Sequence, residues 1–127
     1  MSYLCKAGAA DVSDAATTDQ WLIDAPAAGT IRVDSCFIAL TEVTGAMTVD
    51  GVISLKVGGN EVGTVTLTDS ASVGDTFVFT PDGTYATTTN PIVEFADGDD
   101  ILVEIKTAAT GVTTGDGDVY LDINFGF

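Results

Sequence analysis

The chain has 127 residues, which suits a single domain, and its hydrophobic fraction of 46% can supply a core, which argues against intrinsic disorder. Its 19 acidic residues face four basic ones, so the formal net charge is −15 at pH 7. This charge repels nucleic acid and anionic membranes and suits a cationic partner or a high-salt setting, although solubility alone would also explain it.

The first seventeen residues are small, polar and rich in alanine. They contain one lysine and lack the apolar stretch of a secretory signal peptide, and the chain has no apolar run long enough to cross a membrane. We therefore predict an extended N-terminal arm over residues 1–17 and one domain over residues 18–127. Cys5 and Cys36 are far apart and form no disulfide framework, so we expect thiols, with Cys36 as a small core residue.

From Thr18 onward, short apolar or alternating segments are separated by turn residues, as in β-proteins. The expected strands are DQWLID (19–24), TIRVDSCFIAL (30–40), GVISLKV (51–57), NEVGTVTLT (60–68), DTFVFT (75–80), PIVEF (91–95), DILVEIKT (100–107) and DVYLDINF (118–125). Gly58, Gly59 and Asn60 predict a hairpin turn, and a change of parity near Gly63 predicts a β-bulge. The alternation predicts a core that includes Ile53, Leu55, Val103, Ile105, Leu121 and Ile123.

Two segments of the chain repeat one pattern. Residues 41–57 read TEVTGAMTVDGVISLKV and residues 107–123 read TAATGVTTGDGDVYLDI, which match as T-x-x-T-G-x-x-T-x-D-G-x-[IV]-x-L-x-[IV]. Each predicts a strand–loop–strand unit, one in each half of the chain. We therefore predict an all-β fold, an antiparallel β-sandwich that is jelly-roll-like and has about eight strands.

Aspartates cluster near the expected last two strands. Asp50-Gly51 and Asp116-Gly117 occupy equivalent places in the repeat and predict turns with glycine at positive φ, and residues 97–100 predict the turn before a strand. The other interpretation is a structural Ca²⁺ ion, since strand ends can bring carboxylates together. Its candidate ligands are Asp99, Asp100, Asp116 and Asp118. EF-hand spacing is absent, so we expect no metal and no cofactor, and stability unchanged by chelation.

The sequence argues against catalysis. It contains no histidine, so it lacks the commonest general base and every histidine-dependent triad. It also lacks a phosphate-binding loop, and we predict that the protein is not an enzyme. Trp21, Tyr85 and Tyr120 could form a platform for sugar rings, although core or interface positions are the commoner role of such side chains.

Three segments carry a resemblance to a known group: WLIDAPAAGTIRVDSCFIALTEVTGAMT, ISLKVGGNEVG and FADGDDILVEIKTAATGVTTGDGDVYLDINF. Their order of turn, long apolar strand, hairpin and closing amphipathic strand resembles small jelly-roll-like capsid decoration (cement) proteins of tailed bacteriophages. The similarity covers residues 18–127, and its motifs are general β-turn patterns rather than a signature. This chain is poorer in lysine than a generic member.

The resemblance implies a virion structural protein without catalytic residues, made in the host cytoplasm and located on the capsid surface. It implies a homotrimer that binds the major capsid protein from outside and stabilises the capsid, with no nucleic-acid or membrane partner. We expect contact through an apolar patch with acidic residues at its rim, and an arm at residues 1–17 that becomes ordered on the capsid. The alternatives are a receptor- or carbohydrate-binding β-sandwich of a tail fibre or cell surface, and an acidic Ca²⁺-dependent adhesion domain.

Overall fold

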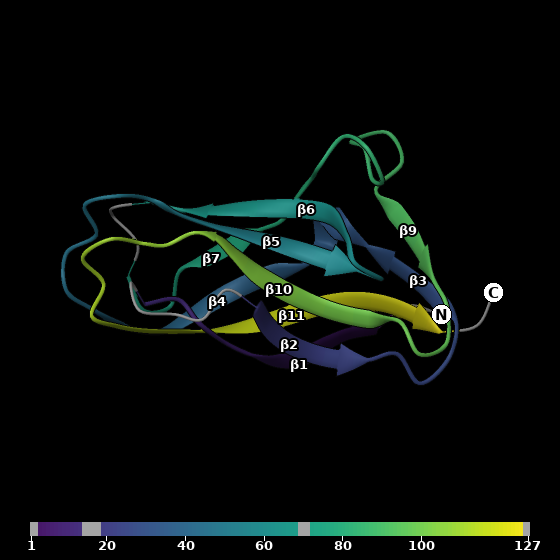
Figure 1. The fold of residues 1–127 in the computed structure, drawn as a ribbon, viewed down its shortest axis with the longest axis horizontal. Helices are drawn as coiled ribbons and strands as arrows, with labels where there is room; N and C mark the ends of the chain where they lie inside the picture. Colours follow the sequence, from purple (N-terminus) through teal and green to yellow (C-terminus); the bar gives the residue numbers. More distant parts are fainter. Residues whose placement is uncertain (1–2, 14–18, 69–71, 126–127) are drawn as a thin grey trace.

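Two antiparallel sheets lie face to face and enclose the core (Figure 1). The computed structural model describes residues 3–13, 19–68 and 72–125, apart from the side chains of residues 3, 5, 7, 19, 21 and 22. The described residues contain eleven strands and a single 3₁₀ turn. The predicted all-β sandwich is confirmed, and its jelly-roll connectivity stays a prediction.

The first sheet has six strands, and the last strand of the chain lies at its centre. They are β1 (Tyr3–Asp11), β3 (Gly29–Arg32), β4 (Phe37–Thr44), β7 (Thr76–Val78), β9 (Ile92–Phe95) and β11 (Thr114–Phe125). β4 pairs with the N-terminal part of β11 and β3 with its C-terminal part. β1 pairs with β11 along the other edge, while β7 and β9 extend the sheet beyond β4 and β3.

The second sheet has five strands, in the order β2–β10–β5–β6–β8. Their bounds are β2 (Asp19–Asp24), β5 (Gly51–Val57), β6 (Asn60–Leu67), β8 (Thr80–Pro81) and β10 (Asp100–Thr107). The turn predicted after β5 is confirmed, since Gly58 and Gly59 adopt φ of 59° and 85°. The predicted bulge is confirmed as well: Leu55 pairs with Gly63 and Lys56 with Glu61, which leaves Val62 as the extra residue.

Strict alternation in β11 builds the centre of the core. Val119, Leu121 and Ile123 are each 0% exposed, and the residues between them face outward. Five of the six predicted core residues are buried, and the sixth, Ile105, is half-buried and packs against the core. Cys36 is buried as expected, and its thiol donates a hydrogen bond to the carbonyl of Arg32.

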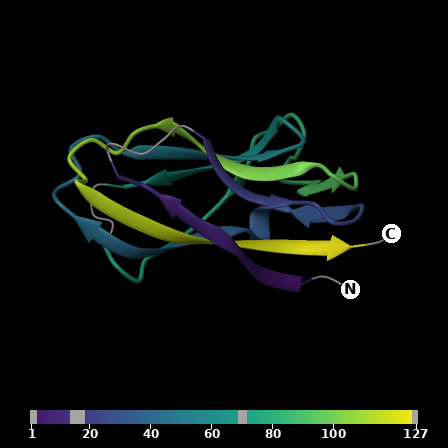
Figure 2. The same ribbon diagram turned by 60° about the horizontal axis from the view of Figure 1, so that its bottom comes forward.

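The predicted N-terminal arm is wrong for the described part of residues 1–17. Residues 3–11 form β1, which runs beside β11 from the Tyr3–Ile123 pair to the Asp11–Asp116 pair (Figure 2). Ala10 and Val12 are buried in the core. A strand on this edge satisfies backbone groups of β11 that would otherwise lack partners. Residues 1–2 and 14–17 lie outside the described part of the chain.

Two predicted strands are each divided in the structure. The segment 30–40 is interrupted by the 3₁₀ turn Val33–Ser35, which keeps both Val33 and Cys36 buried although their spacing does not alternate. The segment 75–80 places β7 in the first sheet and β8 in the second, with the buried Phe79 between them. These divisions, together with β1, explain why the structure has more than eight strands.

The two repeated segments provide the connections between the sheets at one end of the sandwich. Residues 45–50 lead from β4 in the first sheet to β5 in the second, and residues 108–113 lead back from β10 to β11. The two loops bind each other: the backbone N–H of Thr48 donates to the carbonyl of Thr110 at 2.7 Å, and that of Thr113 donates to Thr44 at 2.9 Å.

Equivalent glycines allow the two loops to approach this closely. Gly45 and Gly111 occupy the same place in the repeat and adopt φ of 100° and 96°. A Cβ atom on Gly45 would lie 2.3 Å from the carbonyl oxygen of Gly111, and one on Gly111 would lie 2.0 Å from that of Ala46. Both conformation and space therefore require glycine here.

The turns predicted at the two Asp-Gly pairs of the repeat are wrong. Gly51 begins β5 and Gly117 lies inside β11, and neither has a positive φ. Both glycines are buried, and a Cβ atom on Gly117 would lie 2.7 Å from the side chain of Ile38. These positions need glycine because Ile38 on the paired strand β4 and Ala109 in the other connecting loop lie too close for a Cβ atom, rather than because of turn geometry.

We predict that Leu121→Ala lowers the free energy of unfolding by ~2–5 kcal/mol, because it removes buried methyl groups and leaves a cavity. Urea denaturation measures the loss. Leu4→Ala is the matched control, since Leu4 lies on the adjacent strand β1 but is 58% exposed, and it should change stability by less than ~0.5 kcal/mol. Equal losses in the two variants would contradict the assigned faces.

We predict that Gly111→Ala destabilises the protein much more than Gly59→Ala. Both substitutions force alanine into positive φ, at a cost of about 1–2 kcal/mol. Gly59 has no heavy atom within 4 Å of an added Cβ, whereas Gly111 faces the backbone of Ala46, which adds a further ~1–3 kcal/mol. Similar unfolding free energies for the two variants would show that the two loops can separate at little cost.

Candidate functional site

The four aspartates considered as metal ligands lie in different sheets. Asp99 and Asp100 stand at the start of β10 in the second sheet, and Asp116 and Asp118 lie in β11 of the first. The strand ends therefore do not bring the four carboxylates together, because residues 108–113 cross from the second sheet to the first. Within residues 3–13, 19–68 and 72–125, no group of three or more acidic or cysteine side chains could hold a metal ion.

The aspartates that precede β10 form a turn, as predicted. The backbone N–H of Ala96 donates to the Asp99 carboxylate at 2.8 Å, the N–H of Asp99 donates to the Ala96 carbonyl at 3.1 Å, and Gly98 has a φ of 86°. In β11, by contrast, Asp116 lies opposite Asp11 of β1 and Glu42 of β4. This row of like charges crosses the first sheet and destabilises it, because like charges directly opposite one another repel.

Each of the four basic residues pairs with a carboxylate. The pairs are Lys6–Asp118 at 3.2 Å, Arg32–Asp34 at 2.8 Å, Lys56–Glu104 at 3.0 Å and Lys106–Glu61 at 3.2 Å. Partly exposed pairs of this kind contribute about 0.2–1 kcal/mol each. Their larger consequence is that the excess negative charge dominates the surface potential.

A polar cluster on the outer side of the second sheet shifts one pKa. Ser54 is 1% exposed, and its hydroxyl donates to Oε1 of Glu61. This hydrogen bond lowers the pKa of Glu61 below its ordinary value; desolvation opposes the effect, and Lys106 adds to the lowering. The cluster satisfies a buried hydroxyl and is best understood as structural.

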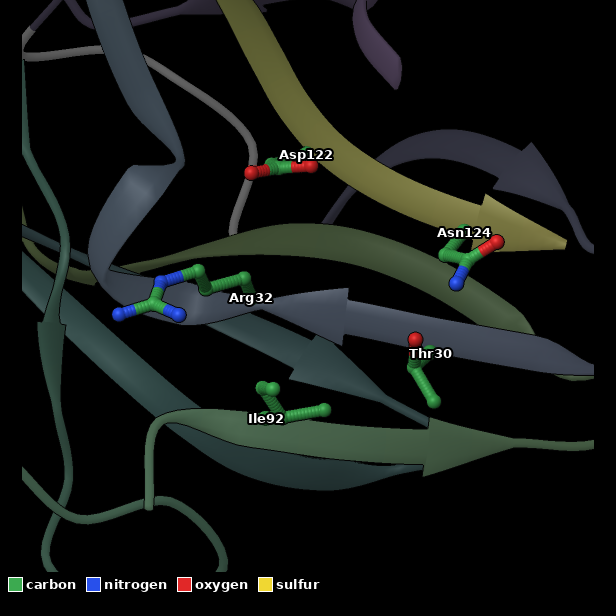
Figure 3. A pocket seen from close by; sticks show the side chains of 5 residues that line it. All are labelled: Thr30, Arg32, Ile92, Asp122 and Asn124. Carbon is green, nitrogen blue, oxygen red and sulfur yellow. The ribbon is translucent and has the colours of Figure 1, made fainter. Parts of the chain in front are cut away.

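A shallow groove lies on the outer side of the first sheet, over β3, β9 and β11. It has a volume of about 230 Å³, and its lining residues are Thr30, Arg32, Ile92, Asp122 and Asn124. The strand register brings them together, since Thr30 pairs with Asn124 and Arg32 pairs with Ile92. Figure 3 shows these five side chains around the groove, which we call the β3–β11 groove.

The chemistry of the β3–β11 groove suits binding. Arg32 donates hydrogen bonds, Asp122 accepts them, and Thr30 and Asn124 can do both. The groove has one carboxylate, and the sequence has no histidine, so the pair of titratable groups typical of acid–base catalysis is missing from it. What the lining offers a ligand is a set of hydrogen-bond donors and acceptors.

None of these five residues stands out as part of a site in the sequence. They occupy outward-facing positions of strands whose side chains alternate between buried and exposed, and such positions are normally occupied by ordinary solvent-facing residues. The signal that could have drawn attention to them is Arg32, the one arginine of the chain. Its neighbours in the groove come from β9 and β11, about 60 and 90 residues later in the chain. These residues become neighbours only because the distant strands pair with β3.

The described aromatic residues that were considered as a sugar platform, Tyr85 and Tyr120, lie on different elements of the fold. Tyr120 stacks on Phe37 of the neighbouring strand, with ring centroids 4.8 Å apart and planes inclined by 16°. Tyr85 is 53% exposed and lies between β8 and β9. The side chain of Trp21 lies outside the described part of the structure. Tyr120 is therefore part of a cross-strand ring pair on the outer side of the first sheet.

Comparisons with protein-family models, with curated proteins and with solved structures each gave no match. Among the described residues, no helix has the length and apolar character needed to span a membrane.

We predict that Glu61 stabilises the folded protein at neutral pH and that this contribution is lost in acid. Because its pKa is lowered in the folded state, the ionised carboxylate stabilises the fold above the pKa of the unfolded chain, and this contribution is lost as the pH falls through the folded value. The difference in unfolding free energy between the wild type and Glu61→Gln should therefore shrink from pH 7 towards pH 3, as measured by urea denaturation. Ser54→Ala, which removes the largest cause, should weaken this dependence, whereas a difference independent of pH would contradict the assignment.

Proposed function

We propose that this protein is a decoration (cement) protein that binds the outer surface of a bacteriophage capsid as a homotrimer and reinforces it. The major capsid protein is then its partner, and the virion surface is its location. The resemblance of residues 18–127 to such proteins suggests the idea. The antiparallel β-sandwich supports it, because a cement protein needs a compact body that transmits force between capsomers.

The observation that carries the proposal is the exposure of two valines in the loops at one end of the sandwich. We call this the loop end, and it comprises residues 45–50, 72–75 and 108–113, at the left of Figure 1. Val49 is 48% exposed and Val73 is 61% exposed. The neighbouring Asp50 and Asp75 are exposed as well. Apolar side chains with acidic neighbours suit a contact that is dry at its centre and charged at its rim.

A symmetric trimer would make such small contacts sufficient. Once one subunit has bound, the effective concentration of the other two at the capsid rises, so weak individual contacts add up to stable attachment. An apolar contact also tolerates salt, whereas exposed charge pairs are screened when the Debye length falls to ~4 Å near half-molar salt. The loop end therefore replaces the N-terminal segment as the proposed point of contact, because residues 3–11 belong to β1.

We predict that the purified protein co-sediments with expanded capsids that lack it, and that binding persists from dilute buffer to about 0.5 M salt, because the contact is apolar. The double variant Val49→Asp, Val73→Asp should weaken binding by about tenfold or more, since it places charges in the contact. Val78→Asp is the matched control, because Val78 is 55% exposed but lies on β7, and it should bind as the wild type does.

Three results would count against this proposal. Loss of binding with rising salt would show that charge, and not the apolar surface, holds the protein on the capsid. Equal losses in the double variant and in Val78→Asp would remove the loop end as the contact. Absence of binding to any capsid would favour the receptor- or carbohydrate-binding module of a tail fibre or cell surface.

A further inference from the structure

We propose that the β3–β11 groove binds one unit of a neutral carbohydrate. The site lies on the outer side of the first sheet, away from the loop end. It therefore adds a second binding activity to capsid attachment and does not depend on it.

An ion pair orients the Arg32 side chain in the absence of a ligand. Its Nε atom donates to Oδ1 of Asp34 at 2.8 Å, and the side chain remains 50% exposed. A guanidinium group carries its donors in a rigid plane. The contact at Nε therefore also restricts the directions of the Nη donors, which lowers the entropic cost of binding a ligand.

The polar groups around the groove complement hydroxyl groups. A sugar hydroxyl both donates and accepts, and adjacent hydroxyls present this pair of functions repeatedly. Asp122 supplies acceptors, Arg32 supplies donors, and Thr30 and Asn124 on paired strands supply both. Charged partners strengthen such hydrogen bonds.

Charge disfavours the other classes of small ligand. Anions are repelled by Asp122 within the groove and by the net charge of −15. The net charge attracts organic cations, but in the groove they find a single carboxylate beside the like-charged Arg32, and a divalent ion needs more oxygen ligands than this. A purely apolar ligand would leave the polar groups without partners. A neutral molecule rich in hydroxyl groups meets none of these obstacles.

The size and the walls of the groove agree with this choice. Its volume of about 230 Å³ is below the roughly 300–1,000 Å³ of sites for drug-sized ligands, which suits a single sugar ring. Ile92 is 45% exposed and offers an apolar wall to the C–H face of the ring. The stacked pair Phe37–Tyr120 lies on the same outer side, since Tyr120 is the outward position before Asp122, and offers a surface for a neighbouring unit.

NMR titration of the ¹⁵N-labelled protein tests the proposal without any capsid. The probes are the methyl glycosides of glucose, galactose, mannose and N-acetylglucosamine, each raised to ~50 mM because one-ring contacts give dissociation constants near the millimolar range. Sodium acetate and inorganic phosphate serve as anionic probes of similar size. We expect at least one glycoside to shift the amides of residues 30–32 and 122–124 in a saturable way, and neither anion to do so.

Two variants and a control connect the shifts to the groove. Asp122→Asn, which keeps the shape of the side chain, and Asn124→Ala should each weaken binding at least about fivefold. Thr66→Ala changes an exposed hydroxyl on β6 of the second sheet and should leave binding unchanged. The amide spectra themselves verify that each variant is folded.

The proposal is overturned if none of the four glycosides shifts these amides, if acetate or phosphate shifts them as strongly, or if both variants bind like the wild type. Capsid co-sedimentation is a separate measurement, so a failure of sugar binding and a failure of capsid attachment are distinguished directly.

Discussion

The pairing of β11 on both of its edges is the constraint on which the rest of the structure depends. Twelve residues long, this strand joins β1 on one side and β3 and β4 on the other. Its inward side chains are buried at the centre of the core. Its outward side chains form a continuous row, and the two nearest its C-terminal end line the groove. One register therefore fixes the core and the recognition surface together.

The second constraint is the contact between the two loops that cross from sheet to sheet. Gly45 and Gly111 let their backbones touch, so the sheets are held together at that end by hydrogen bonds as well as by the core. The exposed valines of the loop end and the β3–β11 groove lie on different parts of one sandwich. The negative surface keeps anionic partners away from both, while it leaves apolar contacts and neutral hydroxyl groups unopposed.

The sequence by itself determined the elements whose physics is local. Alternation identified the core faces of β5, β10 and β11, because side chains of a strand alternate between its two sides. Glycines marked the turn at Gly58–Gly59, and the change of parity marked the bulge beside Gly63. The repeat identified two equivalent loops. The turns in these loops were predicted at the Asp-Gly pairs, but the glycines with positive φ are those of the Thr-Gly pairs, Gly45 and Gly111.

What depended on long-range pairing was decided by the tertiary structure alone. The alanine-rich residues 3–11 lack a strong strand pattern and become a strand because β11 offers them an edge. Gly117 suggests a turn in the sequence and is instead required by the side chain of Ile38 on the neighbouring strand β4. The groove was equally invisible, because Arg32 and Asp122 become neighbours only through the register of β3 with β11. Local patterns specify which face of a strand is buried, whereas the partner that lies beside it is chosen by packing of the whole chain.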